Sequence, residues 1–283
     1  MEINNNFISK TEFISTSGVY KIPYTFLIII LQLFFGGFVL FVVNLWFINS
    51  IYFLLTGSEF YRSGVKAEWY FWLLVPLNIY GNIFLFSLSI ILFSAVVNKT
   101  LNLMHAPREG VFEKGSKDWK YMHRRFWTAY FPIWLARALP LPWLDVLVYR
   151  LFGVRIGKNV VTYEGYIDPE LIEIGDFTMT SLNICIFSHL IYQDKVIIKR
   201  VKIGEACIIG PQSIVTPGTI LNDRAVLGAN SYTYLSQKLE SDLIHVGTPA
   251  TITFPVQSLE KSKEKVDLIK EKDKSRSINK GGV

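Results

Sequence analysis

Four histidines occur in the chain, and His189 is the one whose position favours a chemical role. It stands at the end of a run of short repeats, directly before a segment in which the repeat is interrupted. An imidazole has an ordinary pKa near 6.5, so at cytoplasmic pH it is largely neutral and able to take a proton from a hydroxyl or an amine. His189 is therefore the predicted general base. His245, just before the sequence VGTPA, is a weaker candidate for lining the same site.

The segment that follows His189, residues 190–202, is rich in cations. Four basic residues of this segment are suited to bind the phosphate groups of a substrate, namely Lys195, Lys199, Arg200 and Lys202. The same cations also fit a solvated basic face near an anionic membrane. Asp194 is predicted to orient His189 or to bind an acceptor amine. Asn183, in the repeat before His189, is predicted to bind the acceptor.

Cys185 and Cys207 are the two cysteines, and the sequence contains no CxxC motif. Cys185 falls at a repeat position that is predicted to face inward, and Cys207 at a position of small residues. Both are therefore interpreted as packing residues rather than nucleophiles. Only His189 and His245 lie in the repeat region, whereas a histidine-ligated catalytic zinc needs about three protein ligands. We expect no metal site and no permanently bound cofactor.

The repeat that must position His189 begins at Ile156 and has a period of six residues. Gly often follows its first position and a small residue takes its fifth, while the first position is aliphatic at Ile156, Ile174, Ile186, Ile203, Ile209, Val215, Leu221 and Leu227. Each strand and turn makes one side of a triangular coil, so about 18 residues complete a turn. This pattern predicts an all-β, left-handed parallel β-helix. Residues 162–173 are predicted to form a partly irregular coil, because Thr162 and Asp168 interrupt the aliphatic column.

Two uncharged apolar segments precede the repeat, one between Lys21 and Glu59 and one from Trp69 to Asn98. A membrane-spanning helix needs about 20 apolar residues, so each segment is predicted to hold one, near residues 24–48 and 70–97. Pro76 is expected to kink or loosen the second helix, which then begins after it. Basic residues are concentrated after the second span, which favours a cytoplasmic N-terminus and a cytoplasmic C-terminal region.

The predicted fold class is thus a two-helix transmembrane α region followed by the β-helix. Its domains are a cytoplasmic N-terminal segment (1–21), a two-span hairpin (22–98), a connector (99–155), the β-helix (156–256) and a charged, disordered tail (257–283). In the connector, Pro132, Pro140 and Pro142 are expected to divide an aromatic and basic run into short pieces. Such pieces are typical of interfacial helices at the lipid headgroups, or of a linker packed on the next domain.

The composition supports a membrane protein rather than a nucleic-acid-binding protein. The formal net charge is +6, which fits either partner. Hydrophobic residues make up 51% of the chain and the mean hydropathy is +0.31. An apolar share above the usual range of soluble domains favours the lipid bilayer as the partner.

The repeats of residues 203–232, followed by VGTPA at 246–250, resemble those of the hexapeptide-repeat acyltransferases. This resemblance covers roughly residues 150–255. It implies acetyl-CoA or another acyl-CoA as the donor, a homotrimer with active sites between neighbouring prisms, and His189 as general base. Gly210 and Ala229 are assigned to the donor site together with the cations of residues 190–202.

A narrower resemblance extends upstream to about residue 107, through EGVFEKGSKDWKYMHRRFW, LVYRLFGVRIGKNV and SHLIYQDKVIIKRVKIGEACIIGPQSIV. These segments are similar to the membrane-embedded C-terminal tail domains of nonribosomal peptide synthetases of the poly-ε-lysine synthetase type. Such tails let a free amine attack a thioester. The chain shows no adenylation or carrier domain, so a phosphopantetheine thioester would be expected to arrive on a separate carrier protein.

Together these features predict an acyltransferase in the cell membrane, with a cytoplasmic catalytic domain and a hydroxyl or amine acceptor. One alternative is an amide-bond-forming enzyme that uses aminoacyl thioesters. The other is a non-catalytic trimeric membrane scaffold, in which the β-helix serves only for assembly.

Overall fold

The computed structural model describes residues 23–57 and 69–256, which form two compact units. The first, here called the helical unit, comprises the described residues up to Leu144 together with Ile191–Val196. The second, the β-helix unit, comprises Asp145–Leu190 and the described residues from Ile197 onward. The N-terminal segment, the segment between the two apolar helices and the charged tail, for which predictions were made, lie outside the described residues.

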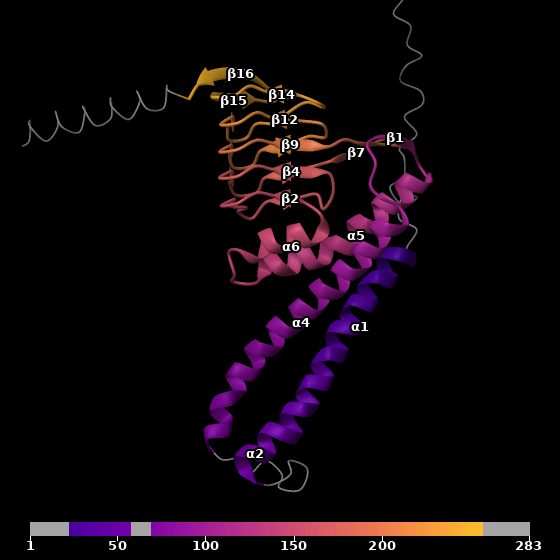
Figure 1. Cartoon of the computed structure of the whole chain (residues 1–283), viewed down its shortest axis with the longest axis vertical. Helices are drawn as coiled ribbons and strands as arrows, with labels where there is room; N and C mark the ends of the chain where they lie inside the picture. Colours follow the sequence, from indigo (N-terminus) through magenta and orange to yellow (C-terminus); the bar gives the residue numbers. More distant parts are fainter. Residues whose placement is uncertain (1–22, 58–68, 257–283) are drawn as a thin grey trace, which may run out of the picture. The chain divides into compact units, whose positions relative to one another are not determined.

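The helical unit contains two long apolar helices that lie side by side (Figure 1). The first is α1 (Pro23–Trp46), which continues through a π-helix (Phe47–Ile51) into α2 (Tyr52–Thr56), and the second is α4 (Trp69–Met104). Tyr24–Leu54 and Leu73–Met104 are long and apolar enough to cross a membrane by length and composition, with mean hydropathies of 2.8 and 2.0. Helices are therefore present where both apolar segments predicted them. α4 begins before Pro76, so the predicted start after this proline is wrong.

The connector is more continuous than its prolines suggested. Helix α5 (Lys117–Ala138) runs straight through Pro132, so the prediction of short pieces is wrong here. A proline cannot donate to the carbonyl of the residue four positions earlier, in this case Thr128. Gln32 Nε2 of α1 donates to that carbonyl instead, at 3.0 Å, which compensates for the missing helix bond. Pro140 and Pro142 do separate α5 from the next helix, α6 (Leu144–Phe152).

Polar side chains join the helices of the helical unit. Asn44 and Asn82 exchange reciprocal amide hydrogen bonds of 2.8 and 3.2 Å between α1 and α4. Gln32 also donates to Ser94 Oγ at 2.9 Å, and Gln32 and Ser94 are fully buried. Hydrogen bonds of this kind hold helices together where the surroundings are apolar.

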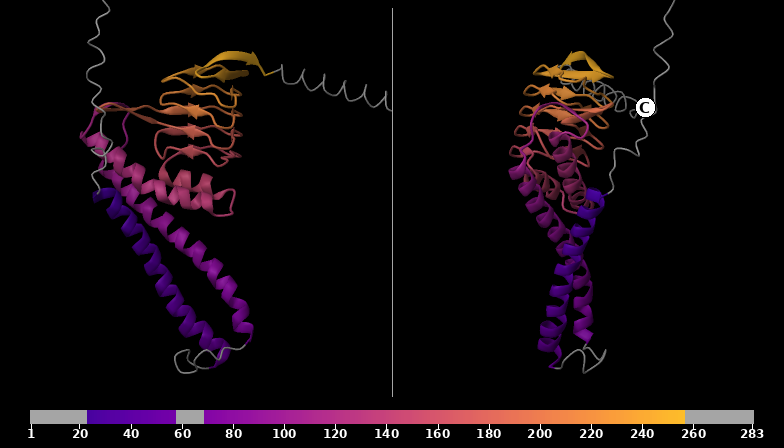
Figure 2. Two further views of the ribbon diagram at one scale, coloured as in Figure 1. Left: turned by 180° about the vertical axis from the view of Figure 1, so that it is seen from behind. Right: turned by 90° about the vertical axis from the view of Figure 1, so that its right-hand side faces the viewer.

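The β-helix unit is a three-sided prism whose strands are parallel except for the last, β16, which is antiparallel to β15; Figure 2 shows it from two further directions. One side has strand order β14-β12-β9-β4-β2, the second β16-β15-β13-β10-β5 and the third β11-β6-β3. Partners are 18 residues apart in the regular coils, as in Ile208↔Val226 and Leu221↔Ile203. The predicted parallel β-helix is therefore present, and its left-handed sense stays a prediction. The strands are β2 (Arg155–Ile156), β3 (Tyr166–Ile167), β4 (Ile172–Ile174), β5 (Met179–Thr180), β6 (Cys185–Ile186), β9 (Val201–Ile203), β10 (Ile208–Ile209), β11 (Ile214–Val215), β12 (Ile220–Leu221), β13 (Val226–Leu227), β14 (Lys238–Leu239), β15 (Leu243–Gly247) and β16 (Ala250–Pro255).

The core of the prism consists of the first and fifth repeat positions. First-position residues such as Ile209, Val215 and Leu227 are fully buried, and so is Cys207 at a fifth position. The sixth position lies between them in an extended strand and must point outward, because successive side chains alternate. Ile208 is accordingly 45% exposed, and Cys185 is half-buried on the outer surface. The prediction that Cys185 faces inward is wrong for this reason.

The coil predicted to be irregular is retained in the prism with an altered spacing. Ile167 of β3 pairs with Ile186 of β6, 19 residues later, whereas Ile156 pairs with Ile174, 18 residues later. One extra residue is therefore accommodated after β3, where Asp168 follows Ile167. Helix α6 packs on this coil, because Tyr149 Oη donates to Gly165 O at 3.1 Å and accepts from Ile167 N at 3.2 Å.

A hairpin leaves the prism after the second coil. Its strands are β7 (His189–Tyr192) and β8 (Lys195–Ile198), and β8 pairs in turn with β1 (Gly110–Glu113). The insertion lengthens the spacing between paired residues to 29 in Ile174↔Ile203, compared with 18 elsewhere. His189 is thus the first residue of the segment that departs from the repeat.

Candidate functional site

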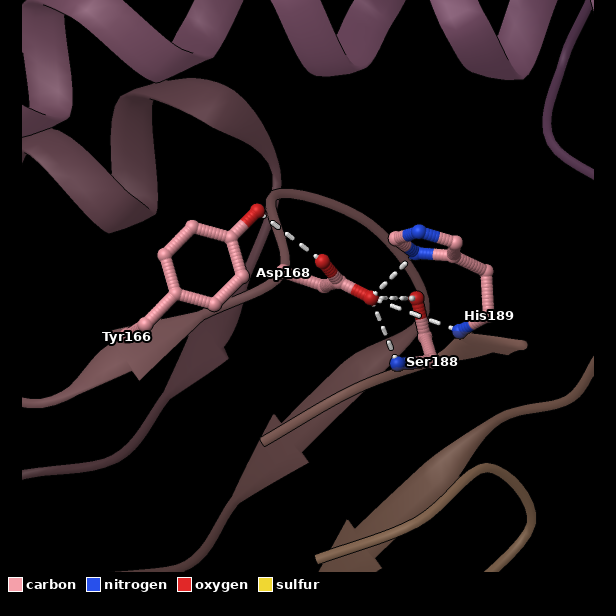
Figure 3. A network of polar contacts seen from close by, with 4 residues as sticks. All are labelled: Tyr166, Asp168, Ser188 and His189. Atoms are coloured by element: carbon pink, nitrogen blue, oxygen red, sulfur yellow. Dashed lines mark hydrogen bonds and ion pairs between the residues drawn. The ribbon is translucent and has the colours of Figure 1, made fainter. Parts of the chain in front are cut away.

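The His189 ring contacts Asp168 of the coil below, as Figure 3 shows. His189 Nδ1 and Asp168 Oδ2 are 2.7 Å apart. The Asp168 side chain is 1% exposed and that of His189 is 17% exposed. A buried carboxylate therefore faces an imidazole that reaches the surface.

Further hydrogen bonds fix the orientation of the Asp168 carboxylate. Oδ2 accepts from Ser188 N at 2.7 Å, from Ser188 Oγ at 3.2 Å and from His189 N at 3.3 Å. Oδ1 accepts from Tyr166 Oη at 3.1 Å. Because a buried carboxylate is costly unless it is hydrogen-bonded, these donors offset the cost of burying Asp168.

The electrostatics of the site raise the pKa of His189 above its ordinary value of 6.5. Burial alone would lower this pKa, but the charge and hydrogen bond of Asp168, together with the charge of Glu170, outweigh burial. An ionised Asp168 accepts a hydrogen bond from the protonated Nδ1, which fixes the tautomer of the neutral ring. Nε2 is then the basic nitrogen, which is the arrangement that a general base requires.

Asp194, which the sequence suggested as the orienting group, belongs to the helical unit, whereas His189 belongs to the β-helix unit. Asp194 lies in the turn of the β7–β8 hairpin, 77% exposed. Its carbonyl accepts from Lys114 N at 2.7 Å, and its carboxylate lies 3.9 Å from Lys114 Nζ. Asp168 occupies the orienting position instead.

The cations predicted to bind donor phosphates lie in different surroundings. Lys195 is exposed at the start of β8, and Lys199 Nζ donates to Ser236 Oγ at 2.8 Å. Arg200 forms an ion pair of 2.7 Å with Glu173. Lys202 lines a shallow groove on the side formed by β2, β4, β9 and β12. Within the β-helix unit, Lys199, Arg200 and Lys202 therefore have three different sets of neighbours.

The remaining predicted residues lie at three further places in the prism. Asn183 is an exposed corner residue with a φ of 56°. His245 is buried in β15, where its Nε2 lies 3.2 Å from the Glu240 carbonyl. Gly210 and Ala229 are neighbours in successive coils: a Cβ on Gly210 would lie 2.6 Å from Ala229 N. The close packing of this corner requires glycine at Gly210.

The shallow groove has a volume of about 670 Å³, and its lining includes Arg155, Glu173, Lys202 and the corner glycines Gly157, Gly175 and Gly204. Neither His189 nor Asp168 belongs to this lining. The described lining of this groove contains no histidine.

Asp168 is the residue that sequence reasoning missed as a functional group. The six-residue frame predicts an inward residue at Asp168 and indicates only an irregular coil, whereas in the structure the neighbouring Ile167 takes the inward position and Asp168 follows it. A buried carboxylate requires partners, so the break in the pattern was itself the available signal.

Comparisons with known proteins agree with the repeat. Residues 200–234 match the family described as the hexapeptide repeat of succinyl-transferase. The delta-poly-L-ornithine synthetase of Acinetobacter baumannii is 25% identical over 142 residues, which cover 50% of this chain and 10% of that protein. A colanic acid biosynthesis acetyltransferase of Escherichia coli is 27% identical over 152 residues, covering 42% of this chain and 82% of the relative. The chain thus spans only about a tenth of the synthetase but most of the acetyltransferase.

Solved structures with a similar fold are also acetyltransferases. A hexapeptide-repeat acetyltransferase of Vibrio cholerae matches with a TM-score of 0.40 and 17% identity, covering 50% of this chain and 95% of that one. A maltose O-acetyltransferase of Clostridium difficile matches with a TM-score of 0.43 and 15% identity, covering 56% and 95%. The hexapeptide-repeat resemblance seen in the sequence is confirmed by the family match and the curated relatives.

Proposed function

We propose that this protein is a membrane-anchored acyltransferase, which moves an acyl group from a thioester donor to a hydroxyl or amine acceptor. His189 is the general base and Asp168 orients it. The observation that carries the proposal is the 2.7 Å contact between a buried carboxylate and a partly exposed imidazole at the break of the repeat. The acetyltransferase named among the relatives supports the same reaction class.

The reaction needs one proton acceptor and one proton donor, and His189 serves as both in turn. Nε2 takes the proton of the acceptor O–H or N–H while the heteroatom attacks the thioester carbonyl carbon. The tetrahedral intermediate then collapses with cleavage of the C–S bond. The departing thiolate receives the proton from the imidazolium, which yields the ester or amide, a free thiol and neutral His189. Asp168 stabilises the imidazolium between the two transfers.

Acetyl-CoA or another acyl-CoA is the proposed donor, and a phosphopantetheine thioester on a carrier protein is the alternative. Both present the same thioester at the end of the same pantetheine arm. We propose Gly210, Ala229 and the cations Lys195, Lys199, Arg200 and Lys202 as donor contacts, and Asn183 as an acceptor contact.

The two apolar helices are proposed to anchor the chain in the cell membrane, with the β-helix unit in the cytoplasm. Tyr24–Leu54 has 31 residues and Leu73–Met104 has 32. At about 1.5 Å per residue each extends about 46–48 Å, whereas the hydrocarbon core is about 30 Å thick. About ten residues of each helix therefore lie outside the core. Gln32 of α1 contacts Ser94 of α4 and Thr128 of α5. We place these contacts at the cytoplasmic end of the two helices, where α5 packs on the parts that extend beyond the hydrocarbon core.

The family resemblance also leads us to propose a homotrimer with active sites between prisms. A second candidate function is amide-bond formation, favoured by the likeness to a protein named as a poly-L-ornithine synthetase. An amine acceptor fits this candidate and an alcohol does not. Purified protein in lipid nanodiscs, given acyl-CoA and either amines or alcohols, separates the two by mass spectrometry of the products.

The decisive experiment replaces His189 by Gln and by Ala and measures thiol release from acyl-CoA. Loss of the base is expected to lower the rate by about 10²–10⁴-fold. His123→Gln in α5 is the matched control, since the proposal gives that histidine no role. Melting temperature and subunit mass, measured for every variant, exclude a folding or assembly defect. Full activity in a folded His189→Gln protein overturns the mechanism, and absence of any thioester binding favours the scaffold alternative.

A further inference from the structure

Helix α6 closes one end of the prism with one face and leaves an apolar face exposed on the other. Val148, Tyr149 and Phe152 are at most 1% exposed against the first coil. Leu147 and Leu151, on the opposite side of α6, are 44% and 43% exposed. A nine-residue helix that is apolar on both faces therefore has a second surface to cover.

Polar contacts place α6 firmly on the first coil. Asp145 Oδ2 accepts from Thr162 Oγ1 at 2.6 Å, and Arg150 Nε donates to Ile156 O at 3.1 Å. With the two bonds of Tyr149, these contacts reach the coil at Ile156, Thr162 and the Gly165–Ile167 segment. The exposed face of α6 is consequently a fixed part of the end of the prism.

The rim of this end has the composition of a surface that contacts lipid headgroups. Tyr163 and Val161 of the first coil are 53% and 42% exposed. In α6 and the first coil, residues 144–171, the exposed charged residues are Arg150, Arg155, Lys158 and Glu164. An aromatic ring beside an excess of cations suits the surface of a bilayer that contains anionic lipids.

We propose that this end of the prism, the exposed face of α6 with the rim of the first coil, rests on the bilayer surface. The acceptor is then an amphiphile whose reacting hydroxyl or amine projects from the lipid headgroup toward the prism. This inference rests on the proposed function, since it concerns the acceptor of the same His189 site.

The height of the site above the membrane follows from the order of the coils. Asp168 directly follows β3 of the first coil, and His189 follows β6 of the second coil, which pairs with β3. The two coils are one strand spacing of about 4.8 Å apart, and α6, about 10–12 Å across, lies between the first coil and its own exposed face. His189 therefore lies on the order of 15 Å above that exposed face, so a group that is linked to a lipid headgroup must project beyond the headgroup layer of about 5–7 Å to reach it.

A fluorescence measurement tests the contact without any assay of activity. Cys185→Ser removes the accessible thiol, while Cys207 stays, since it is fully buried and burial raises the pKa of its thiol. Leu147→Cys in this background is labelled with bimane, and the protein is placed in nanodiscs of phosphatidylcholine and phosphatidylglycerol that carry brominated acyl chains. Leu235→Cys is the matched control, a leucine with 37% exposure in a later coil.

Bimane at position 147 is expected to lose at least about half of its fluorescence in brominated nanodiscs, because the α6 face then touches the acyl boundary. Bimane at position 235 is expected to keep its fluorescence. Equal fluorescence of both labels, or loss at position 147 that occurs equally in unbrominated nanodiscs through contact with a second copy, overturns the proposal.

The second arm concerns the acceptor. Leu147→Ser combined with Leu151→Ser is expected to slow transfer to an amine or sugar hydroxyl on a lipid headgroup severalfold and to leave transfer to the same group in free solution unchanged. His189→Gln abolishes both transfers, so failure of the proposed function is distinguishable from failure of the docking. Equal use of lipid-linked acceptor by the wild type and the double variant counts against the proposal.

Discussion

The two halves of the β-helix share one repeat but fill its inward positions differently. In the later coils these positions hold Ile209, Val215, Leu221 and Leu227, all at most 1% exposed. In the first coils Thr162 and Thr180 take two of these positions, and Asp168 directly follows the inward Ile167; all three are also buried but need hydrogen-bond partners. Asp145 supplies a partner to Thr162, and Ser188, His189 and Tyr166 supply partners to Asp168.

The regular coils therefore contribute mainly to the stability of the fold, whereas the first coils carry the groups proposed for the chemistry. An aliphatic column stabilises the prism by burial alone, at about 25 cal/mol per Å² of apolar surface. A polar coil contributes less by burial, and its carboxylate is acceptable only because several donors meet it. The irregular coil is therefore less stabilising than the regular coils, but its Asp168 orients the proposed proton acceptor His189.

The strongest test of the aliphatic half compares two adjacent isoleucines of β10. Ile209→Ala removes a fully buried side chain and is expected to lower the free energy of unfolding by about 2–5 kcal/mol. Ile208→Ala, on the outer surface at 45% exposure, is expected to cost less than about 1 kcal/mol. Denaturant unfolding measures both. Similar losses for the two variants would contradict the assignment of inward and outward positions.

Asp168→Asn tests the polar half, because it retains the size of the side chain and removes its charge. The variant loses the charge-assisted bond to His189, worth about 1.5–3 kcal/mol, so the transfer rate is expected to fall roughly 10- to 100-fold. Thiol release from acyl-CoA gives the rate, and circular dichroism checks the fold. Glu164→Gln, an exposed carboxyl of the same coil, is the control. An unchanged rate in Asp168→Asn would remove Asp168 from the mechanism.

The pH dependence of kcat/KM is a second test of the contact between Asp168 and His189. A general base acts in its neutral form, and the pKa of His189 lies above 6.5, so kcat/KM is expected to rise with pH through a midpoint above 6.5. In Asp168→Asn the burial of the ring remains while the main raising influence is gone, so the midpoint is expected to move to lower pH. A midpoint that does not move would show that another group titrates.

The protonation of His189 is expected to affect the stability of the fold in the opposite direction to its effect on activity. A histidine whose folded pKa is raised stabilises the fold fully below its unfolded pKa near 6.5, and this contribution is lost as pH rises through the folded pKa. Activity should thus rise over the pH range in which the Asp168 contact becomes less stabilising. Unfolding of the wild type and Asp168→Asn at several pH values measures this difference.

Much of the fold follows from periodicity and hydropathy. The period of six sets the coil, and the uncharged segments contain the two long helices, because both signals are repeated over many residues. Errors arose where one local rule was applied without tertiary context. Pro132 does not end α5, since Gln32 from another helix supplies the lost hydrogen bond. Cys185 points outward, since strand alternation decides the sixth position.

The site was less accessible to sequence reasoning than the fold. His189 could be singled out, because it adjoins the break of the repeat. Its orienting carboxylate could not be identified in this way, since Asp168 lies 21 residues away in the coil below, whereas Asp194 is close in sequence. Because the coils stack, residues about one turn apart in the sequence come into direct contact. The extra residue after β3 determines which residue lies beside His189. A single extra residue of this kind cannot be recognised from the six-residue period.

Tyr166→Phe is the smallest expected effect and examines the outermost bond of the polar coil. The phenol donates to Asp168 Oδ1 at 3.1 Å, while its ring lies 5.8 Å from that of Phe187. Phenylalanine keeps the ring contact and loses only the hydrogen bond, worth about 0.5–1.5 kcal/mol, so the rate is expected to fall roughly 2- to 10-fold. Tyr163→Phe, 53% exposed in the same coil, is the control and should leave the rate unchanged. Because the missing bond loosens the carboxylate without removing its charge, the pH midpoint should shift less than in Asp168→Asn. A loss as large as that of Asp168→Asn would mean that Tyr166 contacts the acceptor directly rather than acting through Asp168.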